Sequence, residues 1–357
     1  MANTAFDGEI EIGLLTVPFG TGAKLPEIAQ WSANHGYKRL SIAAWPPPEL
    51  GGSQRKGEDA FVAAHLGSLD DFNESRASEV KGALSSAGIK PHSLAYFENM
   101  STANADERRI LHDNFGKICR IGKMIGADYI GTFPGRNIDM DEEAALKFFI
   151  EKIGPGLQKT AVDNGVKVYF ENCIMEGLMG RKGKVVGNVA YCPANWRRIF
   201  SALDEWYMNP DPSHMVWQGI DYVKAIKEFQ DRVVEVHAKD GYVLEKWRRP
   251  EATKDLEPLP FKAENYETGL VRDDHPVFDW GAGLYYHAAP GLGSVDWGKV
   301  TQAMRETGIA ERGVPLVVEL EDEAFGPRAT GMDNYGKAGF SVSIRTLQPY
   351  CSAGTHL

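Results

Sequence analysis

The sequence lacks the marks of secreted and membrane-spanning proteins. Its 357 residues include only four cysteines, and no two of them form a CxxC pair. Such sparse cysteines are typical of reduced thiols rather than a disulfide framework, so we expect a cytoplasmic protein. No run of 18 apolar residues is present, and residues 1–10 carry none of the basic side chains of a signal peptide.

Positive charge is scarce relative to negative charge. The chain has 39 Lys and Arg against 49 Asp and Glu, which gives a formal net charge of −10. Nucleic acids and anionic membranes select for basic patches, so we expect neither as a partner. A Gly-rich phosphate turn is also missing, because Pro-Phe-Gly-Thr-Gly at 18–22 matches that pattern poorly. This argues against a doubly wound sheet, which is the alternative fold.

Eight short apolar runs alternate with amphipathic segments along the chain. The runs lack strict alternation of apolar and polar residues, as expected for parallel strands covered on both faces. The expected strands are 10–17, 39–43, 90–96, 129–133, 166–170, 206–209, 233–237 and 316–320. The expected helices are 25–35, 75–87, 106–125, 141–164, 195–203, 219–229 and 296–307. This order predicts an α/β protein, a single (β/α)₈ TIM barrel domain spanning residues 1–357.

Residues 241–290, after the seventh strand, interrupt this alternation. The segment is rich in aromatic and charged side chains, and loops of such length are usually functional. We expect a lid-like insertion over the barrel mouth, with an oligomer contact arm as the alternative. Its two histidines, His275 and His287, are either acid/base groups or solvated loop residues. A last helix within 331–350 could lie at an interface, which leaves a homo-oligomer or an accessory subunit open.

Ionisable side chains lie at or near the carboxyl ends of four consecutive late strands. Glu171 follows the fifth strand, Asp211 the sixth, His237 ends the seventh, and Glu319 lies in the eighth. The carboxyl ends of barrel strands meet at one mouth, where active sites lie. Three carboxylates around an imidazole repel one another unless a cation neutralises them. The pattern therefore predicts one divalent metal ion, with Mn²⁺ favoured by the oxygen-rich ligands and Mg²⁺, Co²⁺, Zn²⁺ or Fe²⁺ as alternatives.

Other side chains are expected at the same mouth from their strand positions. Trp45 and Tyr96 end the second and third strands, where aromatic rings either stack on a sugar or cap the core. Arg136, after the fourth strand, either binds a polar substrate group or pairs with Asp139. Glu235 points the same way as the histidine two residues later. It either supports the metal ligands from behind or pairs with a neighbouring strand.

Five longer motifs surround these positions. They are Phe-Glu-Asn-Cys at 170–173, Asp-Pro-Ser-His-Met-Val-Trp-Gln-Gly-Ile-Asp at 211–221, His-Ala-Lys-Asp at 237–240, Pro-Gly-Leu-Gly-Ser-Val-Asp-Trp at 290–297 and Val-Glu-Leu-Glu-Asp at 318–322. Together they resemble the sugar phosphate isomerase/epimerase family of the xylose-isomerase-like TIM barrels. The likeness covers nearly the whole chain, and the 211–221 and 290–297 segments are its specific part.

The resemblance implies that the four candidate ligands hold a single metal ion. It also implies that the two glutamates form an acid/base pair on opposite faces of a substrate carbon. Three further residues would contact or border the substrate, namely His214, Lys239 and Asp240. The sequence departs from the family pattern at 285–289, Tyr-Tyr-His-Ala-Ala, where basic residues are expected. A phosphorylated substrate is therefore not implied, and His287 becomes a candidate substrate-binding residue.

These observations predict an enzyme with a small carbohydrate substrate. We expect a divalent-metal-dependent isomerase or epimerase that abstracts a proton alpha to a carbonyl of a keto-sugar or sugar derivative. The alternative is a metal-dependent lyase that eliminates the aglycone from a 3-keto-glycoside, with a lid histidine protonating the leaving group. A metal-dependent phosphodiesterase would need a basic surface, and a sugar-binding protein without activity would not need the four ligands.

Overall fold

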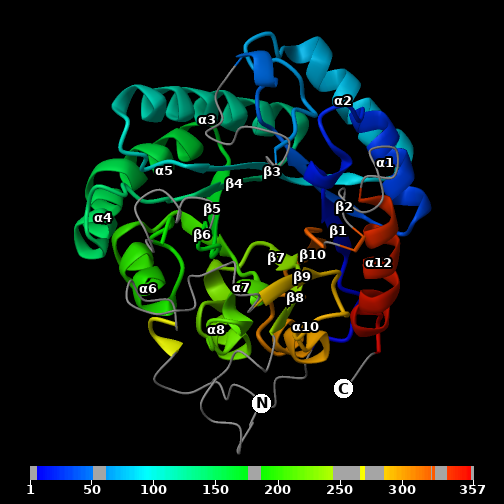
Figure 1. Cartoon of the computed structure of the whole chain (residues 1–357). Coiled ribbons are helices and arrows are strands. Elements are labelled where there is room, and N and C mark those ends of the chain that lie inside the picture. The colour runs from blue at the N-terminus through cyan, green and yellow to red at the C-terminus, as the bar shows by residue number, and fades with distance from the viewer. Residues whose placement is uncertain are drawn as a thin grey trace, which may run out of the picture.

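The computed structural model describes residues 6–50, 62–175, 186–243, 266–269, 285–322, 324–325 and 336–354. Eight parallel strands form the predicted barrel, in the order β6-β5-β4-β3-β2-β1-β10-β7 (Figure 1). They are β1 (Ile12–Leu15), β2 (Arg39–Ala43), β3 (Lys90–Asn99), β4 (Tyr129–Phe133), β5 (Lys167–Glu171), β6 (Trp206–Asn209), β7 (Val236–Ala238) and β10 (Leu316–Val318). A single parallel bridge between Met208 and Val233 joins β6 to the segment before β7 and nearly closes the ring.

Helices surround the strands as an outer ring in Figure 1. They are α1 (Leu25–Asn34), α2 (Glu74–Ala87), α3 (Ala105–Ile125), α4 (Glu142–Phe148), α5 (Gly154–Asp163), α6 (Pro193–Ala202), α8 (Tyr222–Glu228), α10 (Trp297–Glu306) and α12 (Lys337–Cys351). Several begin at a capping Asn or Asp whose side chain accepts a backbone N–H of the first turn, as Asn104 does for α3 and Asp296 for α10. No helix among the described ranges is long and apolar enough to cross a membrane.

Two expected helices differ from the structure. The segment 141–164 is divided into α4 and α5 by a π-helical turn, Phe149–Ile153. Pro155 follows this turn, and proline has no N–H to donate and crowds the preceding turn, so the regular ladder is interrupted there. The helix expected from 219 begins later, at Tyr222, because Gly219 has a positive φ of 70°. That glycine follows a short helix, α7 (Pro212–Val216), which we did not predict.

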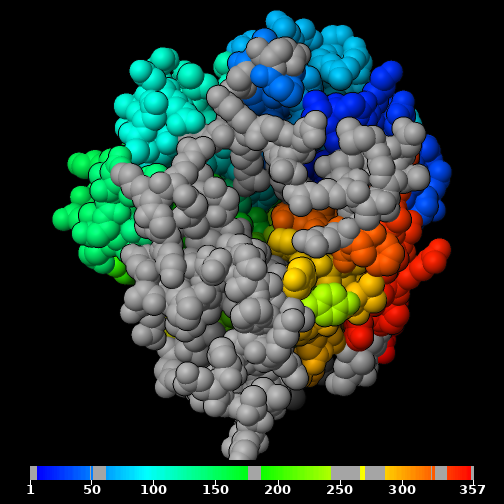
Figure 2. All heavy atoms as spheres, in the orientation of Figure 1, coloured from blue at the N-terminus to red at the C-terminus, as the bar shows by residue number. Residues whose placement is uncertain are grey.

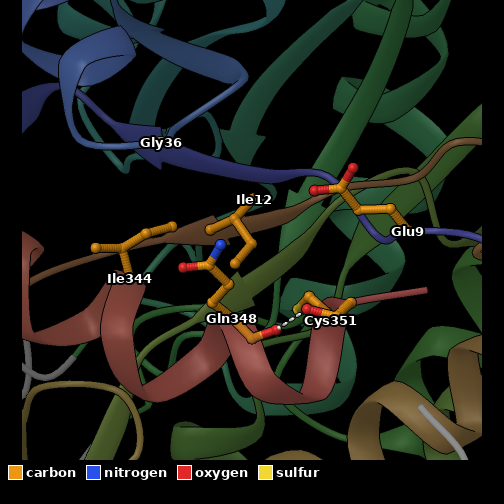
Figure 3. A pocket seen from close by; sticks show the side chains of 7 residues that line it. Glu9, Ile12, Gly36, Ile344, Gln348 and Cys351 are labelled. Atoms are coloured by element: carbon orange, nitrogen blue, oxygen red, sulfur yellow. Dashed lines mark hydrogen bonds between the residues drawn. The ribbon is translucent and has the colours of Figure 1, made fainter. Parts of the chain in front are cut away.

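At the amino end of the barrel, one arginine connects the two ends of the described chain. Arg305 on α10 is 5% exposed, and its guanidinium donates to the carbonyls of Phe6, Gly8, Tyr350, Cys351 and Ser352. Nearby, a small pocket lies between the start of β1 and α12, as Figure 3 shows for Ile12, Ile344 and Gln348. Its cavity volume of about 20 Å³ would admit about one water molecule, which is too little for a sugar.

The long segment after the seventh strand begins and ends as a hairpin. Strand β8 (Asp240–Val243) pairs antiparallel with β9 (Tyr285–Ala288), and β9 reaches the surface as part of the yellow region in Figure 2. Residues 244–265 and 270–284, including His275, lie outside the described residues. Between them, Tyr266 donates to Glu228 on α8 at 2.7 Å. The lid over the mouth therefore stays a prediction.

Candidate metal centre

The structure brings the four predicted ligands together at the carboxyl end of the barrel. Glu171 is the last residue of β5, Asp211 caps α7 just after β6, His237 is the middle residue of β7, and Glu319 follows β10. All four are buried, and one ligand atom from each lies within 4.8 Å of the others. The strand order explains this, because β5, β6, β7 and β10 are consecutive around the nearly closed ring.

Asparagine side chains hold these strand ends in register. Asn172 accepts the N–H of Asp211 at 2.6 Å and donates to its carbonyl at 3.1 Å. Asn209 likewise accepts the N–H of His237 at 2.7 Å. Each amide thus links two neighbouring strands at the level of the ligands. Sequence reasoning gave no role to Asn209, although an amide at the end of a strand beside a candidate ligand is the signal that could have identified it.

The donor set fits a divalent cation. Glu171 Oε1, Asp211 Oδ2 and His237 Nδ1 are buried and make no hydrogen bond of regular geometry among the described residues, although each lies within 3.4 Å of an ion-pair partner. Glu319 Oε2 lies 2.8 Å from His237 Nδ1, and Glu171 Oε1 lies 3.4 Å from the same nitrogen. Three oxygen ligands and one imidazole around a common centre suit a hard or borderline divalent ion such as Mn²⁺, Mg²⁺ or Zn²⁺.

The pKa values of the two glutamates of the site are shifted in opposite directions. Burial, together with the nearby charge of Glu319, raises the pKa of Glu171 to about 8. Burial alone would raise the pKa of Glu319 too, but the positive charges of Lys239 and His237 outweigh it and hold that pKa well below its usual range. Burial also raises the pKa of Asp211. Carboxyls whose pKa values are pushed apart can serve as acid and base at one pH.

Glu235 lies directly behind His237. Its Oε1 is 3.0 Å from His237 Nε2, which leaves Nδ1 to face the other ligands. Ser93 and Tyr169 donate to Glu235 through their hydroxyls at 2.7 and 3.1 Å, and Asn209 donates at 3.4 Å. Both interpretations of this residue therefore hold, because it supports a candidate ligand and also joins neighbouring strands. A carboxylate in this position fixes the tautomer and orientation of a metal-binding histidine.

A buried cation lies beside the ligands. The ammonium of Lys239 is 3.1 Å from Asp211 Oδ2 and 2.9 Å from His214 Nε2. Burial and the charge of Lys239 hold the pKa of His214 well below its usual value, so the imidazole is neutral and accepts from the ammonium. Burial would lower the pKa of Lys239, but the surrounding carboxylates, Glu319 foremost, hold it well above the usual range. Lys239 is therefore charged at neutral pH.

Two other expected pocket residues differ in what they contact. The carboxylate of Asp240 accepts the Trp297 indole N–H and the backbone N–H groups of Gly241, Gly291, Gly293 and Val295. These five bonds involve both oxygens and tie β8 to the 290–297 motif, which is a structural role. His287 lies at the edge of the site, where its Nε2 is 3.3 Å from Glu321 Oε2. Glu321 in turn is 3.6 Å from Lys239, so His287 is connected to the buried cation.

Three expected substrate-binding residues, Trp45, Tyr96 and Arg136, instead contact other parts of the fold. The Trp45 indole donates to Glu98 at 2.7 Å and packs edge-on against Tyr96. The Tyr96 hydroxyl accepts from Asn114 on α3 at 3.4 Å, so it faces the helix layer rather than the mouth. Arg136 donates to the carbonyls of two residues, Val186 and Met140.

Phe97, next to Tyr96, faces the site instead. Its ring lies edge-on to the His237 ring, with centroids 5.8 Å apart. Neighbouring residues of a strand point to opposite faces, so only one residue of the pair can face the site, and here it is the buried Phe97 ring.

Known proteins share this architecture. Residues 57–336 match a family described as xylose isomerase-like TIM barrel, and no curated protein matches the sequence. An IOLI protein with a bound zinc atom has a TM-score of 0.61 at 13% identity, covering 96% of this chain and 99% of that one. A 3-keto-D-glucoside 4-epimerase from E. coli has a TM-score of 0.55 at 15% identity, and the match covers 91% of this chain and 97% of that one. A probable 3-DHS dehydratase from Bacillus anthracis has a TM-score of 0.58 at 11% identity, and the match covers 94% of this chain and 99% of that one.

Proposed function

Because this chain belongs to the xylose isomerase-like TIM barrel family, we propose that it is a divalent-metal-dependent isomerase or epimerase of a keto-sugar or sugar derivative. The observation that carries the proposal is the buried convergence of Glu171, Asp211, His237 and Glu319. Two structural neighbours support it, one with a bound zinc atom and one that acts as a 3-keto-D-glucoside epimerase. The oxygen-rich ligand set favours Mn²⁺ as the native ion.

The arrangement of the two glutamates suits proton transfer at a carbon next to a carbonyl. A divalent ion held by the four ligands would supply Lewis-acid polarisation of that carbonyl. Strands β6 and β7 lie between β5 and β10 in the ring, so Glu171 and Glu319 approach the centre from different sides. One carboxylate takes the alpha proton, and the other returns a proton to the opposite face or to the adjacent carbon. General acid/base catalysis of this kind contributes about 10² to 10⁴ in rate.

Three neighbouring side chains would position the substrate. His214 Nε2 is 3.5 Å from Asp211 Oδ2 and 3.6 Å from Glu171 Oε1, so the ring borders the ligand oxygens. Lys239 lies beside it and carries a positive charge that would stabilise an enolate oxygen. The apolar Phe97 ring next to His237 offers a surface for the apolar face of a sugar.

Deuterium exchange tests the proposal. Protein loaded with Mn²⁺ is incubated in D₂O with free ketoses and 3-keto-glycosides, and each mixture is followed by NMR. We expect deuterium at the carbon alpha to the carbonyl in a recovered or epimerised sugar that retains all of its substituents. Chelator-treated protein provides the background rate. If protein with stoichiometric Mn²⁺ exchanges no sugar of the panel, the isomerase assignment is refuted.

A lyase that eliminates the aglycone of a 3-keto-glycoside is a second candidate. It is favoured by His287, which is 19% exposed and held by Glu321 at the edge of the site, where a leaving group would depart. Such a reaction begins with the same alpha-proton abstraction and ends with protonation of the aglycone. In the D₂O experiment it would release the aglycone and leave an unsaturated keto-sugar. His287→Gln should then slow aglycone release while alpha-proton exchange continues.

A further inference from the structure

The ammonium of Lys239 lies among the same oxygens that would hold the metal ion. Its Nζ is 3.1 Å from Asp211 Oδ2, 3.3 Å from Glu319 Oε2 and 3.8 Å from Glu171 Oε1. Three of the four candidate ligands therefore contact a lysine as well as one another. The side chain is 2% exposed, so water screens its charge weakly. A divalent ion bound by these oxygens would be a close neighbour of like charge, and the two cations would repel each other.

A fourth carboxylate offers the ammonium another position. Glu321 Oε1 is 3.6 Å from Lys239 Nζ, and its side chain is 29% exposed. Glu321 does not belong to the group of four ligands, although it lies only two residues beyond Glu319. The flexible four-carbon stem of a lysine allows its ammonium to shift between such neighbours. His214 Nε2, at 2.9 Å, can accept from the ammonium in either position.

We propose that Lys239 is an internal cation that competes with the metal ion for the carboxylates of the site. Glu321 receives the ammonium when the ion binds. The inference rests on the proposed metal site and adds a determinant of its affinity. The hold of Lys239 on Asp211 and Glu319 weakens metal binding, whereas its attraction to Glu321 favours it. Three ionised carboxylates leave one negative charge beside a divalent ion, so the ammonium stays near the rim of the site.

Calorimetric titration of chelator-treated, full-length protein with MnCl₂ tests this competition. Lys239→Met should bind Mn²⁺ at least about tenfold more tightly than the wild type, because a like charge is removed at close range. Glu321→Gln should bind about three- to tenfold more weakly, because the ammonium loses its second position. The double variant should bind like Lys239→Met, since Glu321 acts through Lys239 and the two effects are coupled.

A surface ion pair provides matched controls. Lys227 and Glu306 are 2.7 Å apart on α8 and α10, so Lys227→Met and Glu306→Gln repeat the same chemical changes away from the site. Both should leave Mn²⁺ affinity unchanged. If the methionine variant does not fold, Lys239→Gln replaces it, with the same expected direction.

The outcomes separate this inference from the proposed function. Equal or weaker Mn²⁺ binding by folded Lys239→Met would overturn the competition. A full Glu321→Gln effect that persists without Lys239 would overturn the role of Glu321 as the acceptor. Absence of Mn²⁺ binding from both the wild type and Lys239→Met would refute the metal-dependent function together with the inference. Binding by Lys239→Met alone would be the strongest support for the competition.

Discussion

Each end of the barrel buries one cationic side chain, and the groups around the two cations differ. At the amino end, Arg305 donates to five backbone carbonyls, which are neutral acceptors. At the carboxyl end, the ammonium of Lys239 faces a group of charged acceptors, the carboxyl groups of Glu171, Asp211, Glu319 and Glu321. The first arrangement satisfies polar groups and stabilises the fold. The second places several carboxyl groups close together, which costs stability and provides a candidate binding site for a metal ion.

The largest expected effect concerns chemistry at the carboxyl end. Glu171→Gln keeps the shape of the side chain but removes its ability to exchange a proton. We expect alpha-proton exchange to fall by about 10² to 10⁴ at saturating Mn²⁺, as for loss of a general acid or base. Unfolding of the metal-free variant at pH 7 should require about as much urea as that of the wild type, because a pKa of about 8 leaves Glu171 uncharged there. Unchanged exchange by a variant with full metal content would remove Glu171 from the mechanism.

The second effect concerns stability at the amino end. Arg305→Met removes the donors for five carbonyls while keeping an apolar stem. We expect the free energy of unfolding in urea to fall by about 3 kcal/mol, as for buried acceptors left unsatisfied. Mn²⁺ affinity should not change.

A surface arginine is the control for that change. Arg198 pairs with Glu143 at 2.7 Å with much of its side chain exposed, and Arg198→Met should cost less than about 1 kcal/mol. Equal losses for the two variants would mean that burial of the guanidinium contributes nothing, and the contrast between the ends would fail.

The third effect tests the support behind the metal ligands. Glu235→Gln retains the side-chain volume but weakens the interaction with His237 Nε2. In the wild type this nitrogen lies 3.0 Å from the Glu235 carboxylate. We expect Mn²⁺ affinity to fall by about 10- to 100-fold, with a shifted visible absorption spectrum in the Co²⁺-loaded protein. Glu98 is also a buried carboxylate, but it bonds the Trp45 indole instead. Glu98→Gln should leave both measurements unchanged, and an equal loss in the two variants would exclude a specific role for Glu235.

The barrel and the convergence of its four candidate ligands could be predicted because the relevant patterns are local. Strands β2, β4 and β6 have the bounds expected from their apolar runs. The four candidate ligands could be placed together from strand ends alone, since parallel strands bring their carboxyl ends to one place. The π-helical turn at Phe149–Ile153 was missed because helical periodicity continues across it, whereas the interruption depends on the Pro155 that follows.

The partners of individual side chains could not be predicted, because they depend on distant segments. The donors to Asp240 include backbone groups at 291–295, about fifty residues away in the sequence. The irregular register between β3 and β4 obscures which of Tyr96 and Phe97 faces the mouth. Lys239 was expected at the pocket border, and only the fold shows its ammonium against the ligand oxygens.

The smallest expected effect is the pH dependence of metal binding. It also distinguishes the two ends of the barrel, because only a change at the carboxyl end should alter it. Burial and the charge of Glu319 raise the pKa of Glu171 to about 8, so at pH 7 its proton must leave before the carboxylate can act as a ligand. Burial would lower the pKa of His237, but the nearby charges of Glu319 and Glu171 hold it well above its usual value, so this ligand must also lose a proton. The affinity for Mn²⁺ should therefore rise with pH through about 8, gaining at most about tenfold per pH unit for each proton released. Calorimetry in buffers of different ionisation enthalpy counts these protons directly. Glu171→Gln should release fewer protons than the wild type, and Arg305→Met should release the same number. If metal binding released no protons at pH 7, the raised pKa of Glu171 would be wrong, and the accumulation of charge that sets the carboxyl end apart would be much weaker than the distances indicate.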